Sequence, residues 1–149
     1  MLKYIIKTKI GLLEIRTKNN LIYSSKFVGD DLELSKYIDE HILRDINNYF
    51  NMESVKLKSK IKLIGTTFQI KVWKQICRIP YGSTITYSEL AEAIGEPKAI
   101  RAVANACSQN RIALFVPCHR VVGKNDVGGY RWDIYRKEIL LSLELCQTI

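Results

Sequence analysis

The stretch TYSELAEAIGEPKAIRAVANACS, residues 86–108, holds two short helical patterns separated by a turn. Thr86 or Ser88 can cap the first helix, which we expect to include Glu89–Ile94. A Gly-Glu-Pro sequence at residues 95–97 then interrupts the pattern. Two helices joined by a glycine-containing turn are typical of a helix-turn-helix.

The second helical pattern runs from Pro97 or Lys98 to Ser108, and proline is suited to the first turn of a helix. Its side chains are mostly small, which would let the helix approach DNA closely, with Arg101 as the long projecting group. A helical pair also occurs in many α-rich domains. The pattern alone therefore leaves both interpretations open.

The residues before this stretch predict a small α/β domain. Three strands rich in isoleucine, leucine and tyrosine are expected at Lys3–Ile10, Leu12–Thr17 and Leu21–Phe27. Apolar residues at helical spacing then predict a helix between Asp31 and Phe50, capped by Asp30 or Asp31. We expect the domain to cover residues 1–55 and a polar, lysine-bearing linker to cover residues 56–63.

The remaining residues, 64–149, predict a second, mostly helical domain. Its expected elements outside the helical pair are a helix at Thr67–Ile79, an extended segment at Ile112–Val116, a loop at Gly123–Tyr130 and a final helix at Ile134–Leu145. The final helix carries Ile134, Ile139, Leu140 and Leu143 as its apolar residues. The fold class is α+β.

Charge and hydropathy narrow the classes of function. The 149 residues carry a net charge of +8, which suits a polyanionic partner such as nucleic acid. The sequence contains no run of eighteen apolar residues, so no membrane span is predicted, and the first residues do not resemble a signal peptide. We expect a soluble, cytoplasmic protein. Between Pro97 and Arg120 the charged residues are all basic: Lys98, Arg101, Arg111 and Arg120.

The cysteines and histidines do not predict a metal site. There are four cysteines and two histidines, and no two cysteines have Cys-x-x-Cys spacing. His41 lies on or next to the apolar stripe of its helix and is interpreted as a residue at the edge of the core. Cys77, Cys107 and Cys146 are expected to be ordinary buried residues.

The remaining cysteine, Cys118, lies in the stretch Val116–Val122, VPCHRVV, directly before a histidine. A thiolate is a strong nucleophile, and a neighbouring histidine is a common base for it. Adjacent side chains on a strand, however, point to opposite faces. Cys118 and His119 would need a bridging water or a tight turn at Pro117 to cooperate, so both a nucleophile and a buried structural thiol remain open.

From Phe68 to Glu144 the sequence resembles the O6-alkylguanine-DNA alkyltransferases, which repair DNA and are consumed in the reaction. The motifs that carry the resemblance are Pro117–Val121, Thr86–Ala91, Pro97–Val103, Asn110 and Gly128–Tyr130. The resemblance implies an N-terminal domain of ribonuclease-H-like form and a C-terminal domain with a helix-turn-helix. It also implies a monomeric protein that needs no cofactor, with double-stranded DNA containing O6-alkylguanine as its partner. Cooperative binding to DNA is left open.

In the mechanism that the resemblance implies, the damaged base is flipped out of the duplex and its alkyl group moves to Cys118. His119 takes the thiol proton through a water, Glu144 holds the imidazole, Tyr87 protonates the leaving guanine and Asn110 supports the active-site turn.

Two further sets of residues follow from the same resemblance. The residues expected at the DNA are Arg101, Ala99, Ala102, Lys98, Ser88, Arg111 and Arg120. The residues expected around the flipped base are Tyr130, Val121, Val122, Arg131 and Gly129.

The sequence departs from the family pattern at three places. Arg131 and Trp132 follow the pocket tyrosine where small residues are usual, and Arg111 stands where many relatives have proline. The N-terminal cysteines that bind zinc in some relatives are absent, so no metal is expected.

Three alternative functions remain open: an alkyltransferase-like protein that flips bases without transfer, a Cys-His hydrolase and a plain helix-turn-helix regulator. Cys118 argues against the first, because such proteins replace the reactive cysteine.

Overall fold

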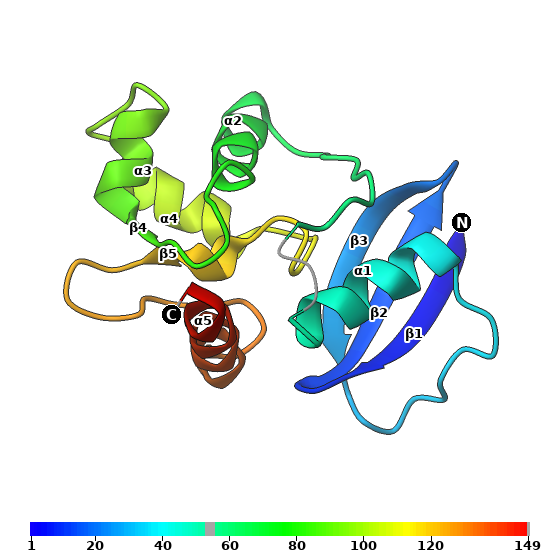
Figure 1. Cartoon of the computed structure of the whole chain (residues 1–149). Helices are drawn as coiled ribbons and strands as arrows, with labels where there is room; N and C mark the ends of the chain where they lie inside the picture. Colours follow the sequence, from blue (N-terminus) through cyan, green and yellow to red (C-terminus); the bar gives the residue numbers. More distant parts are fainter. Residues whose placement is uncertain (53–55, 149) are drawn as a thin grey trace. The chain divides into compact units, whose positions relative to one another are not determined.

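The computed structural model describes residues 1–52 and 56–148, with side chains described as far as Leu145, and divides into two compact units (Figure 1). Unit 1 comprises Met1–Lys62 and Arg111–Phe115, and unit 2 comprises Leu63–Asn110 and Val116–Ile149. The mixed α/β architecture predicted from the sequence is confirmed. Within the described residues, no helix is long and apolar enough to cross a membrane.

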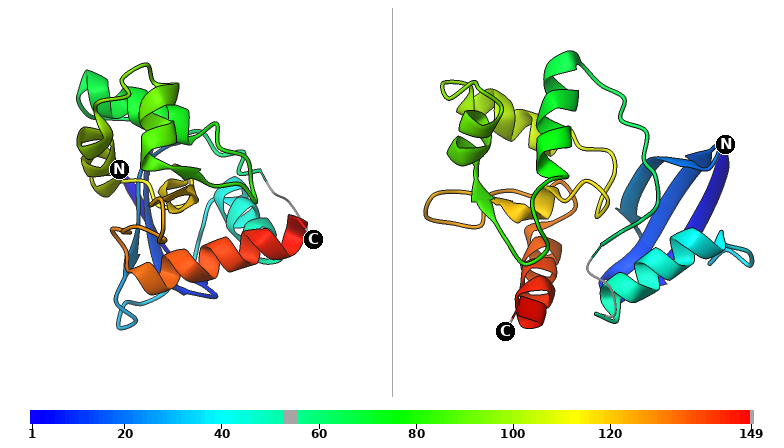
Figure 2. Two further views of the ribbon diagram at one scale, coloured as in Figure 1. Left: turned by 90° about the vertical axis from the view of Figure 1, so that its left-hand side faces the viewer. Right: turned by 45° about the horizontal axis from the view of Figure 1, so that its top comes forward.

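Unit 1 is built on a three-stranded antiparallel sheet in the order β1-β2-β3. The strands are β1 (Leu2–Thr8), β2 (Gly11–Lys18) and β3 (Leu21–Val28). Asn19 and Asn20 form the β2–β3 turn with φ angles of 52° and 63°, as a two-residue hairpin with the right-handed strand twist requires. Helix α1 (Glu40–Phe50) lies across one face of the sheet (Figure 2).

Helix α1 begins later than the sequence predicts. Asp39, and not Asp30 or Asp31, caps it by accepting hydrogen bonds from the backbone N–H groups of His41 and Ile42 at 3.0 and 3.2 Å. The preceding segment instead covers the edge of β1. Its Ser35 donates its N–H to the carbonyl of Ile5, and its hydroxyl accepts the Ile5 N–H. Pairing this strand edge takes precedence over the helical pattern.

The other edge of the sheet, at β3, is paired by two distant segments. Ile22 donates to the Lys60 carbonyl at 2.9 Å and accepts from the N–H of Lys62 at 2.8 Å. Ser25 donates to the Arg111 carbonyl and accepts from the N–H of Ala113 in the same way. Residues 56–62 of the expected linker therefore belong to unit 1.

Residues 112–116 do not form the expected extended segment. Ile112 makes one isolated bridge to Ser25, and Leu114 has a φ of 71°. A leucine in the left-handed region cannot continue an extended strand. The segment therefore folds as a series of turns that buries Leu114 and its neighbours.

Unit 2 contains the predicted helical pair. Its elements are α2 (Thr67–Ile76), β4 (Ile85–Thr86), α3 (Tyr87–Ala93), α4 (Ile100–Ser108), β5 (Val121–Val122) and α5 (Ile134–Thr148). Thr86 caps α3 in a capping box with Glu89, which confirms one of the two predicted caps. Helix α4 begins at Ile100, two residues after Lys98, the later of the two predicted starts, and Pro97 lies in the turn before it. Strands β4 and β5 pair in parallel.

The inward face of α5 differs from the predicted apolar stripe. Lys137, Leu140 and Glu144 are at most 1% exposed, whereas Ile134 is 46% exposed. These three residues have the spacing i, i+3, i+7 and so share one helix face. Hydrogen bonds to the buried polar groups, described below, compensate for their loss of water.

Candidate active site

Cys118 begins a short 3-10 turn, Cys118–Arg120, that follows Pro117. The N–H of Cys118 donates to the Val116 carbonyl at 2.7 Å, and that of Arg120 donates to the Pro117 carbonyl at 2.9 Å. The cysteine and histidine therefore lie on a turn, where the alternation of a strand does not apply. The tight turn at Pro117 was one of the two arrangements that the sequence left open.

A buried ionic network holds the histidine. Nε2 of His119 lies 2.6 Å from Oε2 of Glu144, and both side chains are at most 1% exposed. Arg120 donates from Nε to Oε1 of Glu144 at 2.7 Å and from a terminal nitrogen to Oε2 at 3.1 Å. This fork-like pairing fixes the carboxylate against the imidazole. The Arg120 guanidinium also donates to the Ile79 carbonyl and lies 5.6 Å from the Tyr81 ring centre.

The electrostatics of this network favour a neutral histidine beside a carboxylate. Burial lowers the pKa of His119, and the neighbouring Glu144 opposes that shift only in part. Burial alone would raise the pKa of Glu144, but hydrogen bonds from His119 and Arg120 hold it well below its usual range. Nδ1 of His119 is buried and has no hydrogen-bond partner among the described residues. A neutral imidazole whose Nε2–H is given to the carboxylate has Nδ1 available as a base.

Cys118 is buried, with 6% of its surface exposed. Burial, together with the nearby Cys107 thiol, raises the pKa of Cys118 well above its usual value. Asn110 opposes this shift through a side-chain hydrogen bond to the sulfur and also donates to the Val116 carbonyl at 3.0 Å. The resting thiol is therefore protonated and needs a base when it reacts.

Tyr87, the first residue of α3, lies against the loop at Gly123–Tyr130, here called the glycine loop. Burial raises the pKa of its phenol, while a hydrogen bond from the Gly129 backbone lowers it. Gly128 has a φ of 71°, and a Cβ there would lie 2.6 Å from the Tyr87 hydroxyl. Only glycine combines that backbone conformation with such close contact. The phenol stays protonated at neutral pH and can act as a donor.

Lys137 is a site residue that the sequence analysis missed. Its ammonium group donates to the Val121 carbonyl at 2.6 Å and to the Gly129 carbonyl at 2.8 Å. Burial lowers the pKa of Lys137 to about 8. Through these two hydrogen bonds, Lys137 joins β5 to the glycine loop. The only sequence signal is its i, i+3, i+7 spacing with Leu140 and Glu144.

Lys137 contacts the backbone of two residues that the sequence predicts around the flipped base, Val121 and Gly129. Tyr130 has a buried hydroxyl without a partner among the described residues, and its ring packs edge-on against His119 and Trp132. Val121 is buried and Val122 partly so. The Arg131 side chain is exposed and donates to the Asn110 carbonyl at 2.7 Å, so it fastens the loop to the end of α4.

The residues predicted at the DNA fall into three groups. Those on or near α3 and α4 are accessible, with Ala99 less so than the others: Arg101, Ala102, Lys98, Ala99 and Ser88. Arg111 is exposed and belongs to unit 1. Arg120 is buried and its guanidinium is held by Glu144, so we correct its assignment from a DNA contact to a structural residue.

The other cysteines are distributed differently from the prediction. Cys107 is buried as expected, whereas Cys77 is exposed. The side chain of Cys146 lies outside the described residues. His41 is exposed and does not reach the core. Within the described residues, no three side chains of His, Cys, Asp or Glu gather as metal ligands would.

Comparisons with known proteins identify the family. Residues 67–146 match the model of the 6-O-methylguanine DNA methyltransferase, DNA binding domain. A probable methylated-DNA–protein-cysteine methyltransferase of Acanthamoeba polyphaga mimivirus is 49% identical, over 97% of each chain. An inducible methylated-DNA–protein-cysteine methyltransferase of Bacillus subtilis is 37% identical, over 95% of this chain and 83% of its own.

A solved structure shows the same arrangement of the chain. Mycobacterium tuberculosis OGT in complex with DNA matches with a TM-score of 0.88 and 35% identity, over 97% of this chain and 93% of its own. The fold and the sequence matches are those of methylated-DNA–protein-cysteine methyltransferases. The chain belongs to the 6-O-methylguanine DNA methyltransferase family.

Proposed function

We propose that the chain is a methylated-DNA–protein-cysteine methyltransferase that moves the alkyl group of O6-alkylguanine in DNA to Cys118. The Cys118 sulfur attacks the alkyl carbon as the bond from that carbon to O6 breaks, and guanine leaves with the electron pair. The product is a thioether. It has no electrophilic carbonyl for water to attack, so each molecule reacts once.

The observation that carries the proposal is the His119–Glu144 contact at 2.6 Å, one residue away from a buried thiol. The thiol proton passes through a water to Nδ1 of His119, and Glu144 stabilises the imidazolium that forms. Tyr87 gives a proton to a ring nitrogen of the leaving guanine. One proton leaves the sulfur for His119, and one leaves Tyr87 for the guanine. The charges are restored when the His119 imidazolium releases its proton to solvent and the Tyr87 phenolate takes one up.

The helical pair α3–α4 is the proposed DNA-binding element, as a helix-turn-helix. The buried residues of α4 are Val103, Ala106 and Cys107, which leaves Arg101 and Ala102 on the exposed side. Small side chains let the helix lie close to the minor groove, and Arg101 occupies the space that the flipped base leaves. Unit 1 is proposed to be ribonuclease-H-like and chiefly structural, on the basis of its three strands and single helix.

Intact mass spectrometry tests the transfer. The protein is incubated with a duplex that carries one O6-methylguanine, and peptide mapping then locates the modification. We expect one methyl group on Cys118 and no repair beyond one duplex per protein. Repaired duplex in molar excess over protein that keeps its original mass would exclude the single-turnover mechanism and favour a hydrolase.

Two cysteine variants complete the test. Cys118→Ala should accept no methyl group and still bind the duplex. Cys77→Ala removes an exposed thiol that is not the proposed acceptor and should still take up one methyl group on Cys118. Transfer that survives in Cys118→Ala would place the acceptor elsewhere. Arg101→Ala should weaken duplex binding and slow transfer; an unchanged rate on duplex DNA would remove the role assigned to Arg101.

A further inference from the structure

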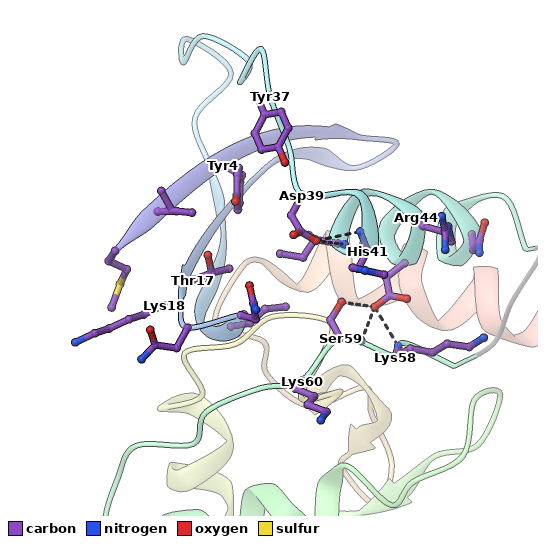
Figure 3. Close-up of a pocket in the computed structure, with 18 residues that line it drawn as sticks. Tyr4, Thr17, Lys18, Tyr37, Asp39, His41, Arg44, Lys58, Ser59 and Lys60 are labelled. Atoms are coloured by element: carbon purple, nitrogen blue, oxygen red, sulfur yellow. Dashed lines mark hydrogen bonds between the residues drawn. The ribbon is translucent and has the colours of Figure 1, made fainter.

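Unit 1 contains a hollow of about 880 Å³ that the alkyl-transfer chemistry does not use. It lies between the ends of β1 and β2, helix α1 and the segment at residues 58–60, and every residue that lines it belongs to unit 1 (Figure 3). A volume of this size is typical of a site that takes up a ligand rather than of a packing defect.

Four cationic side chains border the hollow: Lys18, Arg44, Lys58 and Lys60. All four are exposed, and none makes an ion pair or side-chain hydrogen bond within the described parts of the chain. Figure 3 shows Lys18 at one side, Arg44 and Lys58 toward the other, and Lys60 between them. Cations spread along a rim in this way can contact several anionic groups in a row.

The two carboxylates that line the hollow already have structural partners. Asp39 accepts the two backbone N–H groups that it caps at the start of α1. Asp45 accepts the N–H groups of Lys58 and Ser59 at 3.0 and 2.7 Å, and the Ser59 hydroxyl at 2.5 Å. These bonds direct the carboxylates toward the protein backbone, and the cations outnumber them by four to two.

The same bonds fix the backbone that carries the lysines. Asp45 holds Lys58 and Ser59, and β3 holds Lys60 through the hydrogen bond from the Ile22 N–H at 2.9 Å. The segment is therefore preorganised, which reduces the entropy cost of binding. Tyr37 lies at the border of the hollow beside Asp39 and is 74% exposed (Figure 3). An exposed aromatic ring at the border of a hollow that also carries cations can stack a base whose neighbouring phosphates those cations contact.

We propose that this hollow binds a segment of nucleic-acid single strand, with successive phosphates on the four cations and one base stacked on Tyr37. A strand fits better than a free nucleotide because the cations extend along the rim instead of converging on one point. The site is independent of Cys118 and α4. Its failure would leave the proposed alkyl transfer intact.

The test uses ¹H–¹⁵N NMR of the full chain, titrated with a short undamaged single-stranded oligonucleotide. We expect the backbone amides of Lys18, Ser59 and Lys60 to shift, as a group separate from any shifts in unit 2. In Lys58→Ala/Lys60→Ala the unit 1 shifts should need about 25-fold more oligonucleotide at about 0.1 M salt. That factor follows from two lost phosphate contacts at about 0.7 in the salt exponent for each.

Matched variants separate local contacts from general charge. Lys7→Ala/Lys36→Ala removes two exposed lysines of unit 1 that do not border the hollow, and should leave the affinity within about twofold. Tyr37→Leu should weaken binding about tenfold, and Tyr37→Phe should restore it, because stacking needs only the ring.

Three results would overturn the proposal. The first is an oligonucleotide titration that moves no amide around the hollow. The second is an equal loss of affinity in the two lysine pairs, which would show non-specific attraction. The third is a mononucleotide such as dAMP that shifts the same amides at the same concentration as the strand, which would make a free nucleotide the ligand.

Discussion

Replacing Glu144 by glutamine tests whether the buried network holds His119 ready to act as a base. The substitution keeps the shape of the side chain and one carbonyl oxygen but removes the negative charge. Arg120 then keeps its charge with no carboxylate beside it, at a site where its side chain is only 10% exposed. His119 loses the partner at 2.6 Å that fixes its tautomer.

The expected loss of stability follows from these contacts. Removing one partner of a buried ion pair costs about 3–5 kcal/mol. We expect about 3 kcal/mol for Glu144→Gln, because glutamine still accepts one hydrogen bond. For a chain of this length, a change of about 1 kcal/mol in the free energy of unfolding shifts the melting temperature by roughly 2–4 °C. The variant should therefore melt about 6–12 °C below the wild type.

The rate of transfer should fall by more than partial unfolding of the variant would explain. A positioned general base contributes roughly 10²–10⁴-fold to a rate, and the imidazolium that His119 forms would lose its counter-charge. We expect single-turnover transfer from a methylated duplex to slow at least about 100-fold, measured well below the melting temperature of the variant. Glu138→Gln, on the exposed side of the same helix, is the matched control and should match the wild type in both assays.

Two results would refute this reasoning. A melting temperature of Glu144→Gln equal to that of the control would mean that the ion pair contributes nothing to the fold. A folded Glu144→Gln that transfers at the wild-type rate would mean that His119 does not act as the base, whatever its geometry.

Three further variants probe the surroundings of the thiol. Gly128→Ala should lower the free energy of unfolding by about 1–3 kcal/mol and slow transfer, because the new Cβ would clash with Tyr87. Gly129→Ala is the control, because a Cβ there meets nothing within 4 Å. Equal melting temperatures of the two variants would contradict the clash. As the pH rises from 8 to 10.5, the free energy of unfolding of the wild type should increase relative to that of Lys137→Met, because the unfolded lysine holds a proton there that the buried one has lost. A difference between the two proteins that stays constant with pH in chemical denaturation would exclude the shifted pKa. Asn110→Ala should cost about 0.5–1.5 kcal/mol by removing one of the two hydrogen bonds that the buried Val116 carbonyl accepts, and unchanged thermal unfolding would show that the bond is dispensable.

The local signals in the sequence predicted those elements whose stability is local. Thr86 with Glu89 three residues later indicated the start of a helix, and the capping box confirms it. The Asn19–Asn20 turn is also a local feature, since asparagine tolerates the positive φ angles that the turn needs. The resemblance pointed to Glu144, which lies beside His119 in the structure, although the chain alone gave no reason to bury a glutamate of α5.

Features that depend on distant partners were not predictable in this way. Residues 31–38 have helical spacing, but Ser35 is used to pair the edge of β1. Lys137 interrupts an apolar pattern and reads as a solvent-facing residue until the carbonyls of Val121 and Gly129 are known. Leu114 lies in an apolar run that predicts an extended segment, but its backbone conformation excludes one. In each case a tertiary hydrogen bond or turn outweighs the local preference.

The pairing of β3 has a consequence for the order in which the chain folds during synthesis. The Ser25 N–H and carbonyl find their partners in Arg111 and Ala113, more than eighty residues later. A nascent chain that has been made only as far as Lys62 contains all three strands of the sheet but has an unpaired strand edge at Ser25. Unit 1 is thus N-terminal in sequence and late in completion. Until residues 111–113 leave the ribosome, this strand edge is available to bind other chains.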